Sequence, residues 1–144
     1  MTFDGRELVV DSGGTKKSFS AVSGDTAKGF EPIPKGKYWI QPSELWTRGT
    51  FNNSALCIAS LFLDKTCDEV IAGHKAAWGD QRVTIHPYAK TEVGERGGFF
   101  IHGGATFGSA GCIDLAGGMG GFVEHVNGLL GKGTANCHID LEVK

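Results

Sequence analysis

The sequence predicts a mainly β domain, between all-β and α+β, in which an antiparallel sheet is accompanied by one firm helix. Residues 82–86 alternate apolar and polar side chains as a half-buried strand does, and residues 137–144 repeat that alternation. The apolar residues of 119–130 instead recur three and four positions apart, as they do on one face of an α-helix. Alternation with period two predominates along the chain, which favours a β architecture.

Turn residues and short apolar runs define the other elements. Asp4-Gly5 lies between apolar segments and predicts an N-terminal β-hairpin. Further strands are expected over residues 18–23, 37–41 and 99–101. Residues 54–63 fit either period, whereas residues 67–78 favour a short helix. With no repeat and no break in composition, we expect one domain over residues 1–144, with seven or eight strands.

The composition is that of one ordinary soluble domain. The chain has 144 residues, of which 14 are Lys or Arg and 16 are Asp or Glu, so it lacks the basic excess of nucleic-acid-binding proteins. Its first residues lack the basic start and apolar run of a secretory signal, and no segment approaches the roughly 18 apolar residues of a membrane span. We therefore expect synthesis in the cytoplasm without a signal peptide, no membrane insertion and no nucleic-acid partner.

The residues best suited to chemistry lie in a glycine-rich segment. Fourteen of the 23 glycines fall between Gly94 and Gly133, among apolar residues, which indicates tight backbone geometry. In this segment His102 ends a predicted strand and Cys112 follows ten residues later. A cysteine attacks as its thiolate, which a neighbouring imidazole can generate, and the uncovered backbone at Gly111 suits an oxyanion hole. From the residues alone, the pair is either a nucleophile with its base or a core thiol with a loop imidazole.

The same segment resembles a known enzyme family. Ile101-His102-Gly103, followed by Ser109-Ala110-Gly111-Cys112-Ile113, resembles the signature of the YkuD-type L,D-transpeptidases, which are bacterial cell-wall enzymes. The runs GFFIHGG and GSAGCIDL are similar to a divergent branch, the antibacterial L,D-transpeptidase effectors of type VI secretion systems. Weaker similarity extends over residues 20–115. The resemblance implies a YkuD-like antiparallel β-sandwich or barrel.

The resemblance also implies catalytic roles for the matching residues. Cys112 corresponds to the nucleophile and His102 to the base that activates it. The backbone carbonyl of Gly103 corresponds to the group that orients the imidazole. The backbone N–H groups of Gly111 and Cys112 correspond to the oxyanion hole.

Three more residues are candidates for substrate binding: Arg96, Ser109 and Asp114. The planar guanidinium of Arg96 can hold a carboxylate through two hydrogen bonds, although a solvated charge explains this residue equally well. The chain departs from the family at Ala110, where the family has His, and at Asp114, where it has Arg; the loop before Cys112 is also short. These departures argue against ordinary wall cross-linking, and Asp114 also fits a cap on the following helical turn.

The implied function is that of a cysteine acyltransferase or peptidase acting on the L,D bond of peptidoglycan tetrapeptide stems, by carboxypeptidase and D-amino-acid exchange reactions. The resemblance further implies an exported antibacterial effector that acts in the periplasm of target bacteria, with a secretion apparatus and a cognate immunity protein as partners. Two alternatives stay open: a papain-like cell-wall amidase with His125 or His138 as base, and a non-catalytic peptidoglycan-binding module. No cofactor and no metal are expected, because the chain lacks zinc-ligand spacings such as H-E-x-x-H.

The remaining cysteine, histidine and aromatic residues have simpler interpretations. Cys137 falls on the apolar side of the last strand and is expected in the core. Cys57 and Cys67 either pack in the core or form a disulfide in an oxidising compartment. Imidazoles facing solvent are expected at His86, His125 and His138. The large aromatic residues either line a groove for a sugar or peptide or belong to the core: Trp39, Trp46, Phe51 and Trp78.

Overall fold

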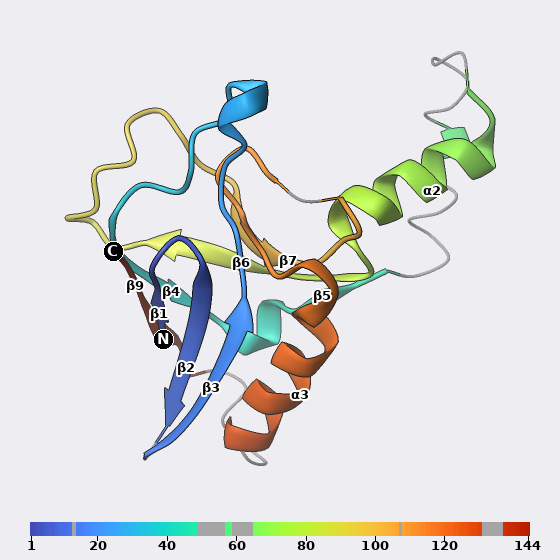
Figure 1. Cartoon of the computed structure of the whole chain (residues 1–144). Coiled ribbons are helices and arrows are strands. Elements are labelled where there is room, and N and C mark those ends of the chain that lie inside the picture. The colour runs from blue at the N-terminus through green and yellow to red at the C-terminus, as the bar shows by residue number, and fades with distance from the viewer. Residues whose placement is uncertain (13, 49–56, 59–64, 107, 131–136) are drawn as a thin grey trace.

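The computed structural model describes all residues except 13, 49–56, 59–64, 107 and 131–136. The strands of this described part form one curled sheet in the order β3-β2-β1-β9-β4-β6-β7-β8, with β5 paired to β6 (Figure 1). Its strands are β1 (Thr2–Phe3), β2 (Glu7–Ser12), β3 (Thr15–Ser20), β4 (Gly36–Ile40), β5 (Trp46–Thr47), β6 (Gln81–Pro87), β7 (Phe99–His102), β8 (Ile113–Asp114) and β9 (Ile139–Val143). The helices are α2 (Cys67–Trp78) and α3 (Met119–Leu130), with short 3-10 turns η1 (Thr26–Lys28), η2 (Pro42–Glu44) and η3 (Ala116–Gly118). The predicted mainly β class with one firm helix is confirmed.

The N-terminal hairpin expected at Asp4-Gly5 is confirmed. Strand β1 pairs antiparallel with β2. In the turn, Oδ1 of Asp4 accepts hydrogen bonds from the backbone N–H groups of Arg6 and Glu7, each 2.9 Å long. A short carboxylate satisfies the turn backbone in this way, which is why Asp is favoured there. Strand β1 also pairs in parallel with β9, so the first and last strands of the chain lie side by side (Figure 1).

Three details of the sheet differ from the prediction, the first being that the described residues form nine strands instead of seven or eight. The strand expected over residues 18–23 is β3, which begins at Thr15 because all six of its residues pair with β2. Beyond its end, Val22 turns away to form an isolated bridge with Asp114. The sheet is also not wholly antiparallel, because the pairs β1–β9 and β7–β8 are parallel.

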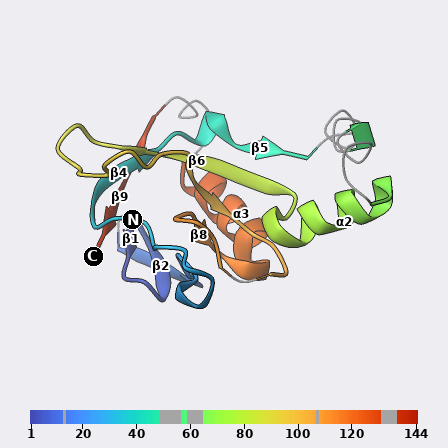
Figure 2. The ribbon, with the colours of Figure 1, turned by 90° about the horizontal axis from the view of Figure 1, so that it is seen from above.

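Both predicted helices are confirmed, and each begins or packs for a local reason. Helix α2 starts with a capping box, in which Thr66 accepts from the backbone of Glu69 while the Glu69 carboxylate accepts from the backbone of Thr66 at 2.7 Å. Helix α3 buries Met119, Phe122 and Val126 against one face of the sheet. Figure 2 shows α3 lying along that face while α2 extends away at one end.

Some side-chain predictions are wrong or fall outside the described residues. Cys137 is an exposed free thiol, because β9 begins only at Ile139 and the alternation does not continue back to residue 137. His125 packs its ring against Phe19, with Nε2 buried, instead of facing solvent. Cys57 and Cys67 form a disulfide, which closes a ten-residue separation at the start of α2. Most of residues 54–63, and Phe51, lie outside the described part of the chain.

Candidate active site

The register of three neighbouring strands creates a row of ionisable side chains across the sheet. Arg82 of β6 lies directly opposite His102 of β7, and His102 lies opposite Asp114 of β8. Paired residues of neighbouring strands project to the same face of a sheet, so the three side chains share one face. The intervening residues Val83 and Ile101 project to the other face and enter the core with α3. The ionisable row therefore lies on the face opposite the core helix.

Cys112 lies on the same face, immediately before β8. It is two residues before Asp114, and its thiol Sγ is 3.9 Å from the carbonyl oxygen of Gly98. The side chain is 5% exposed, and that of His102 is 2% exposed. His102 thus ends β7, and Cys112 immediately precedes the neighbouring parallel strand β8. Their roles as base and nucleophile stay predictions. No hydrogen bond joins them in the described structure, and both ring nitrogens of His102 are buried without a partner.

Burial keeps the thiol and the imidazole uncharged. It lowers the pKa of His102, and the Arg82 charge adds to that effect, whereas the Asp114 carboxylate and the backbone of Gly103 oppose it. Burial likewise raises the pKa of Cys112, which the backbone of Phe100 and the charge of Arg82 partly offset. At neutral pH the resting pair is therefore a thiol and a neutral imidazole. A neutral imidazole has a free acceptor nitrogen and is able to take the thiol proton during attack.

Asp114 is fully buried, and it forms the predicted cap on the following helical turn. Its Oδ1 accepts a hydrogen bond of 2.8 Å from the backbone N–H of Ala116, which supports the start of η3. Its Oδ2 has no partner among the described residues, and burial raises the pKa of the carboxyl group. Because it lies opposite His102, the carboxylate acts on the imidazole electrostatically. Because Asp114 is buried, the structure does not test its predicted contact with substrate, which stays a prediction.

The backbone on the N-terminal side of Cys112 is held in a conformation that favours glycine. Gly111 has φ of 100°, and a Cβ there would lie 2.5 Å from Nη2 of Arg96. The hydroxyl of Ser109 donates a 2.6 Å hydrogen bond to the carbonyl oxygen of Cys112. Ser109 thus stabilises the turn that carries the thiol, and its predicted contact with substrate is not tested by this geometry.

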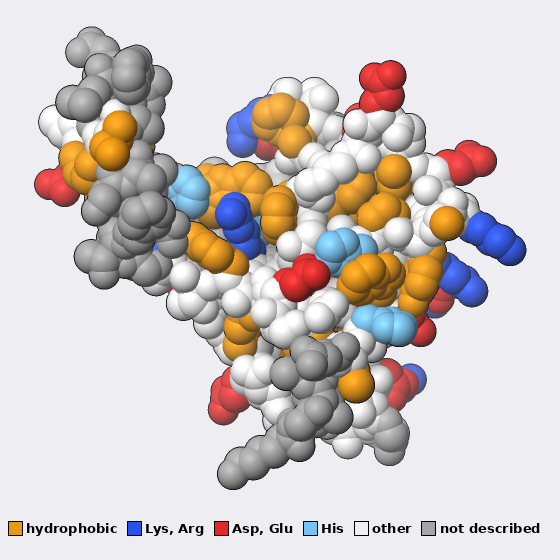
Figure 3. All heavy atoms as spheres, turned by 180° about the vertical axis from the view of Figure 1, so that it is seen from behind, with side chains coloured by type: hydrophobic (Ala, Val, Ile, Leu, Met, Phe, Trp, Pro, Cys, Tyr) orange, Lys and Arg blue, Asp and Glu red, His pale blue; other side chains and the backbone are white. Residues whose placement is uncertain are grey.

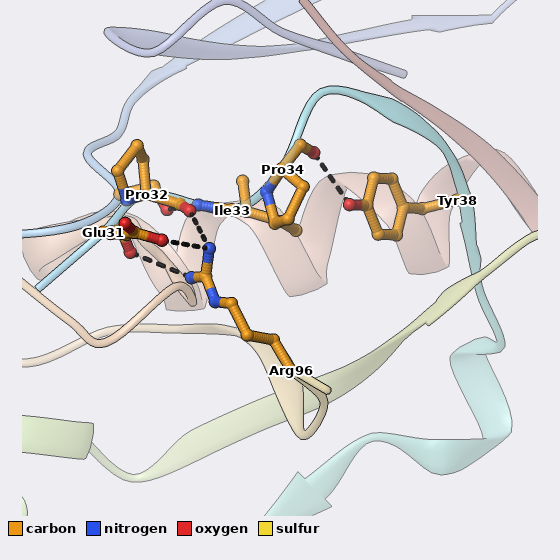
Figure 4. Close-up of polar contacts among 7 residues, drawn as sticks. Glu31, Pro32, Ile33, Pro34, Tyr38 and Arg96 are labelled. Atoms are coloured by element: carbon orange, nitrogen blue, oxygen red, sulfur yellow. Dashed lines mark hydrogen bonds and ion pairs between the residues drawn. The ribbon is translucent and has the colours of Figure 1, made fainter. Parts of the chain in front are cut away.

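Arg96 fastens the loop before β7 to the segment before β4 (Figure 4). It donates to the backbone carbonyl of Pro32 at 2.9 Å and to that of Glu31 at 3.0 Å. The nearby Tyr38 hydroxyl donates to the carbonyl of Pro34 at 2.7 Å, which steadies the same segment. The guanidinium also lies against Gly111, beside the thiol, but its hydrogen bonds are to Glu31 and Pro32. Its role as a substrate carboxylate ligand stays a prediction.

Sequence reasoning did not identify the aromatic and cationic surroundings of His102. The ring of Trp78, at the end of α2, lies 4.9 Å from the imidazole, and Phe100 lies two residues before His102 on β7. Arg82 appeared in the sequence only as a polar residue of an alternating strand. The sequence signals for this arrangement were the alternation of residues 82–86 and the position of His102 at the end of the next strand. They do not reveal that Arg82 faces His102, because the register between two strands is set by tertiary pairing.

A groove of about 560 Å³ adjoins the end of β7. It runs between the C-terminal end of α2 and the start of α3, and it is lined largely by small residues, including Ala76, Gly103, Gly104 and Gly120. Since Gly103 directly follows His102, the groove ends beside the candidate base.

No family model matches the chain, and no curated protein matches it. The similarity to L,D-transpeptidases is therefore a resemblance carried by the motif around Cys112. In the described part of the chain, no group of three His, Cys, Asp or Glu side chains is arranged to hold a metal ion. No helix of that part is long and apolar enough to cross a lipid bilayer.

Proposed function

We propose that this protein is a cysteine peptidase and acyltransferase that acts on the L,D bond of peptidoglycan tetrapeptide stems. One observation carries the proposal: a buried imidazole, whose ring nitrogens meet no hydrogen-bond geometry among the described residues, lies on the same sheet face as a buried thiol. A histidine kept only for packing normally pairs at least one ring nitrogen, because an unsatisfied buried polar group is destabilising by about 1–3 kcal/mol. Such a group fits a proton acceptor whose partner is a substrate or a reaction intermediate.

In the proposed reaction, His102 takes the proton of Cys112 as Sγ attacks the carbonyl of the L-centred third residue. The backbone N–H groups of Gly111 and Cys112 stabilise the oxyanion. Collapse of the tetrahedral intermediate breaks the C–N bond, and His102 returns the proton to the departing D-alanine amine. A thioester remains on Sγ. Water then releases the tripeptide, or a D-amino acid amine takes its place, and either acceptor gives its proton to His102 before the thiol is restored.

The Cys57–Cys67 disulfide supports action in an oxidising compartment, since cytosolic thiols are kept reduced. It is consistent with an exported effector that acts in the periplasm of target bacteria. Delivery by a secretion apparatus and neutralisation by a cognate immunity protein remain parts of the proposal that depend on the resemblance.

Mass spectrometry of a defined substrate tests the proposal. The purified protein and its Cys112→Ala variant are incubated with disaccharide tetrapeptide, with and without D-methionine. Loss of one alanine, or its replacement by methionine, is expected only with the intact thiol. An unchanged substrate mass with both proteins would refute the carboxypeptidase and exchange reactions.

The burial of Cys112 also favours a second candidate, a non-catalytic peptidoglycan-binding module with an inert thiol. The masses of the stem peptide distinguish the two, because a binding module leaves them unchanged even with the intact thiol. The papain-like amidase alternative needs His125 or His138 as base, and these rings contact Phe19 and Trp39, respectively. Full activity of a His102→Ala variant would support the amidase.

A further inference from the structure

Arg82 presents an unpaired guanidinium beside the candidate base. Its Cζ atom lies 4.7 Å from the ring centre of Trp46, 4.9 Å from that of Phe100 and 5.6 Å from that of Trp78. The side chain is half-buried, and it makes no hydrogen bond or ion pair within the described structure. Figure 3 shows this face of the molecule, where basic and hydrophobic side chains lie together near α2.

The neighbouring arginines differ from Arg82 in this respect. Arg48 donates to the Asp80 carboxylate and to the Gly79 carbonyl, both at 3.2 Å. Arg96 donates to backbone carbonyls, as described above. The aromatic rings hold the Arg82 guanidinium by cation–π contacts, and its five N–H donors find no acceptor among the described residues. A planar group oriented in this way is ready to bind a planar anion through two parallel hydrogen bonds.

The charges around Arg82 favour an anionic ligand. The pKa of His74 is lowered by burial and then by Arg48 and Arg82, which shows that the two cations act on the same region. Of the nearby carboxylates, Asp80 pairs with Arg48 and Lys75, whereas Asp114 is buried beyond His102 and forms no ion pair with Arg82. An incoming carboxylate would therefore meet an uncompensated positive charge.

The position of Arg82 relates this anion site to the candidate chemistry. Arg82 and His102 are direct cross-strand partners, so their Cα atoms are roughly 4.5–5.5 Å apart, and Trp78 contacts both side chains. That separation lies between the spans of one and two extended residues, which are roughly 3.5 Å and 7 Å. A carboxylate held by Arg82 would place the bond one residue away close to His102.

We infer that Arg82 binds the carboxylate at the end of the stem peptide, the α-carboxylate of the D-amino acid that leaves. This inference rests on the proposed function and makes the enzyme selective for a free C-terminus at the fourth residue. The side-chain carboxylate of diaminopimelate is the other anionic group within the same substrate. Cross-linked stems, in which the terminal carboxylate is converted to an amide, would be poor substrates.

Three substrates separate the two carboxylates: the diaminopimelate tetrapeptide, its C-terminal amide, and the tetrapeptide with lysine in place of diaminopimelate. The wild-type protein should cleave the first and third at similar kcat/KM and the amide far more slowly. Arg82→Gln should lose roughly tenfold to hundredfold in kcat/KM on the free acid, through KM, and should no longer distinguish acid from amide. Arg82→Lys, which keeps the charge but not the planar fork, should fall between them. Arg6→Gln, at an exposed arginine of the β1–β2 turn, is the matched control and should behave as wild type.

A binding measurement keeps the test independent of catalysis. Because Trp46 and Trp78 flank the guanidinium, tryptophan fluorescence should change saturably on titration with N-acetyl-D-alanine but not with N-acetyl-D-alanine amide. The response should vanish in Arg82→Gln and persist in Arg6→Gln. If the stem peptide is not cleaved but this binding is seen, the proposed function fails and the carboxylate site stands. Cleavage that does not depend on Arg82, or equal binding of acid and amide, would overturn the inference. A preference for the diaminopimelate tetrapeptide over the lysine tetrapeptide that is lost in Arg82→Gln would overturn it too, because Arg82 would then bind the side-chain carboxylate.

Discussion

Gly79→Ala should damage both the fold and the candidate site, since Gly79 packs directly against the residue that follows His102. Gly79 ends α2 with φ of 66° and ψ of −157°, and its N–H donates to the carbonyl of Lys75. A Cβ at this position would lie 2.1 Å from the carbonyl oxygen of Gly103 and 2.7 Å from its carbonyl carbon. Both obstacles are backbone atoms, which no side-chain rotation removes.

The size of the effect follows from two contributions. A non-glycine residue in this region of φ and ψ is destabilising by about 1–3 kcal/mol, and overpacking adds typically 1–3 kcal/mol. The Gly103 carbonyl must also move, from 2.1 Å to at least 3.0 Å, a shift of about 0.9 Å. Misplacement of about 1 Å lowers catalysis roughly a hundredfold. We therefore expect a stability loss of about 2–6 kcal/mol and a large fall in the activity of the molecules that remain folded.

The matched control is Gly73→Ala, in the interior of the same helix. A Cβ there meets no atom within 4 Å, so alanine should stabilise the protein by roughly 0.5–1 kcal/mol through helix propensity. Urea unfolding measures both free energies, and stem-peptide cleavage is compared at a temperature where both variants are folded. Equal stability of the two variants would refute the steric argument. A folded Gly79→Ala protein with wild-type activity would show that the Gly103 carbonyl does not position His102.

Three further predictions concern buried groups. Burial lowers the pKa of His102, so the folded state binds its proton less readily than the unfolded state; its contribution to stability is full above about pH 6.5 and is lost as the pH falls through the folded-state pKa. His102→Gln should therefore lose less stability than wild type between pH 7.5 and 5 in urea unfolding, and parallel curves would contradict this. Cys137→Ser removes the exposed thiol, so that iodoacetamide reports on Cys112. Because burial raises the pKa of Cys112, the alkylation rate should increase with pH and inflect above the ordinary thiol pKa of about 8.5. A rate that is already constant at neutral pH would show that the thiolate is formed there. Phe122→Ala, which removes a core ring 5.6 Å from Phe19, should decrease the unfolding free energy by about 3–5 kcal/mol, and a loss below 1 kcal/mol would show that the core reorganises around it.

Elements specified by local interactions could be predicted from the sequence nearly to the residue. Helix α2 depends on the Thr66–Glu69 capping box and α3 on its apolar periodicity, and both are readable within a dozen residues. The turn at Asp4 is likewise local, because its carboxylate accepts hydrogen bonds from the backbone N–H groups two and three residues further on. Strand β3 was misplaced by three residues because its limits depend on pairing with β2, a contact between separate segments.

The candidate site was predictable only in part for the same reason. Glycine density and the motif indicate His102 and Cys112 as candidates, and the structure places His102 at the end of β7 and Cys112 immediately before the neighbouring β8. Arg82 became relevant only through the β6–β7 register, which a single sequence does not specify. The exposure of Cys137 was missed because alternation was extended two residues beyond the point where pairing begins.

The charges on either side of His102 have opposite effects on the two partners of the proposed proton transfer. Asp114 favours a protonated His102 but disfavours a Cys112 thiolate, whereas Arg82 favours the thiolate and disfavours the protonated ring. At rest, burial outweighs both charges, and the pair is neutral. During attack, negative charge moves from sulfur to the substrate oxyanion while the imidazole becomes positive. Asp114 then stabilises the positive ring. Arg82 is no longer required to stabilise sulfur, because sulfur has lost its negative charge. A carboxylate bound to Arg82 would also cancel its repulsion of the protonated ring. Binding of a free C-terminus would then also make His102 a better proton acceptor. This coupling explains why Arg82, His102 and Asp114 lie in register across three strands.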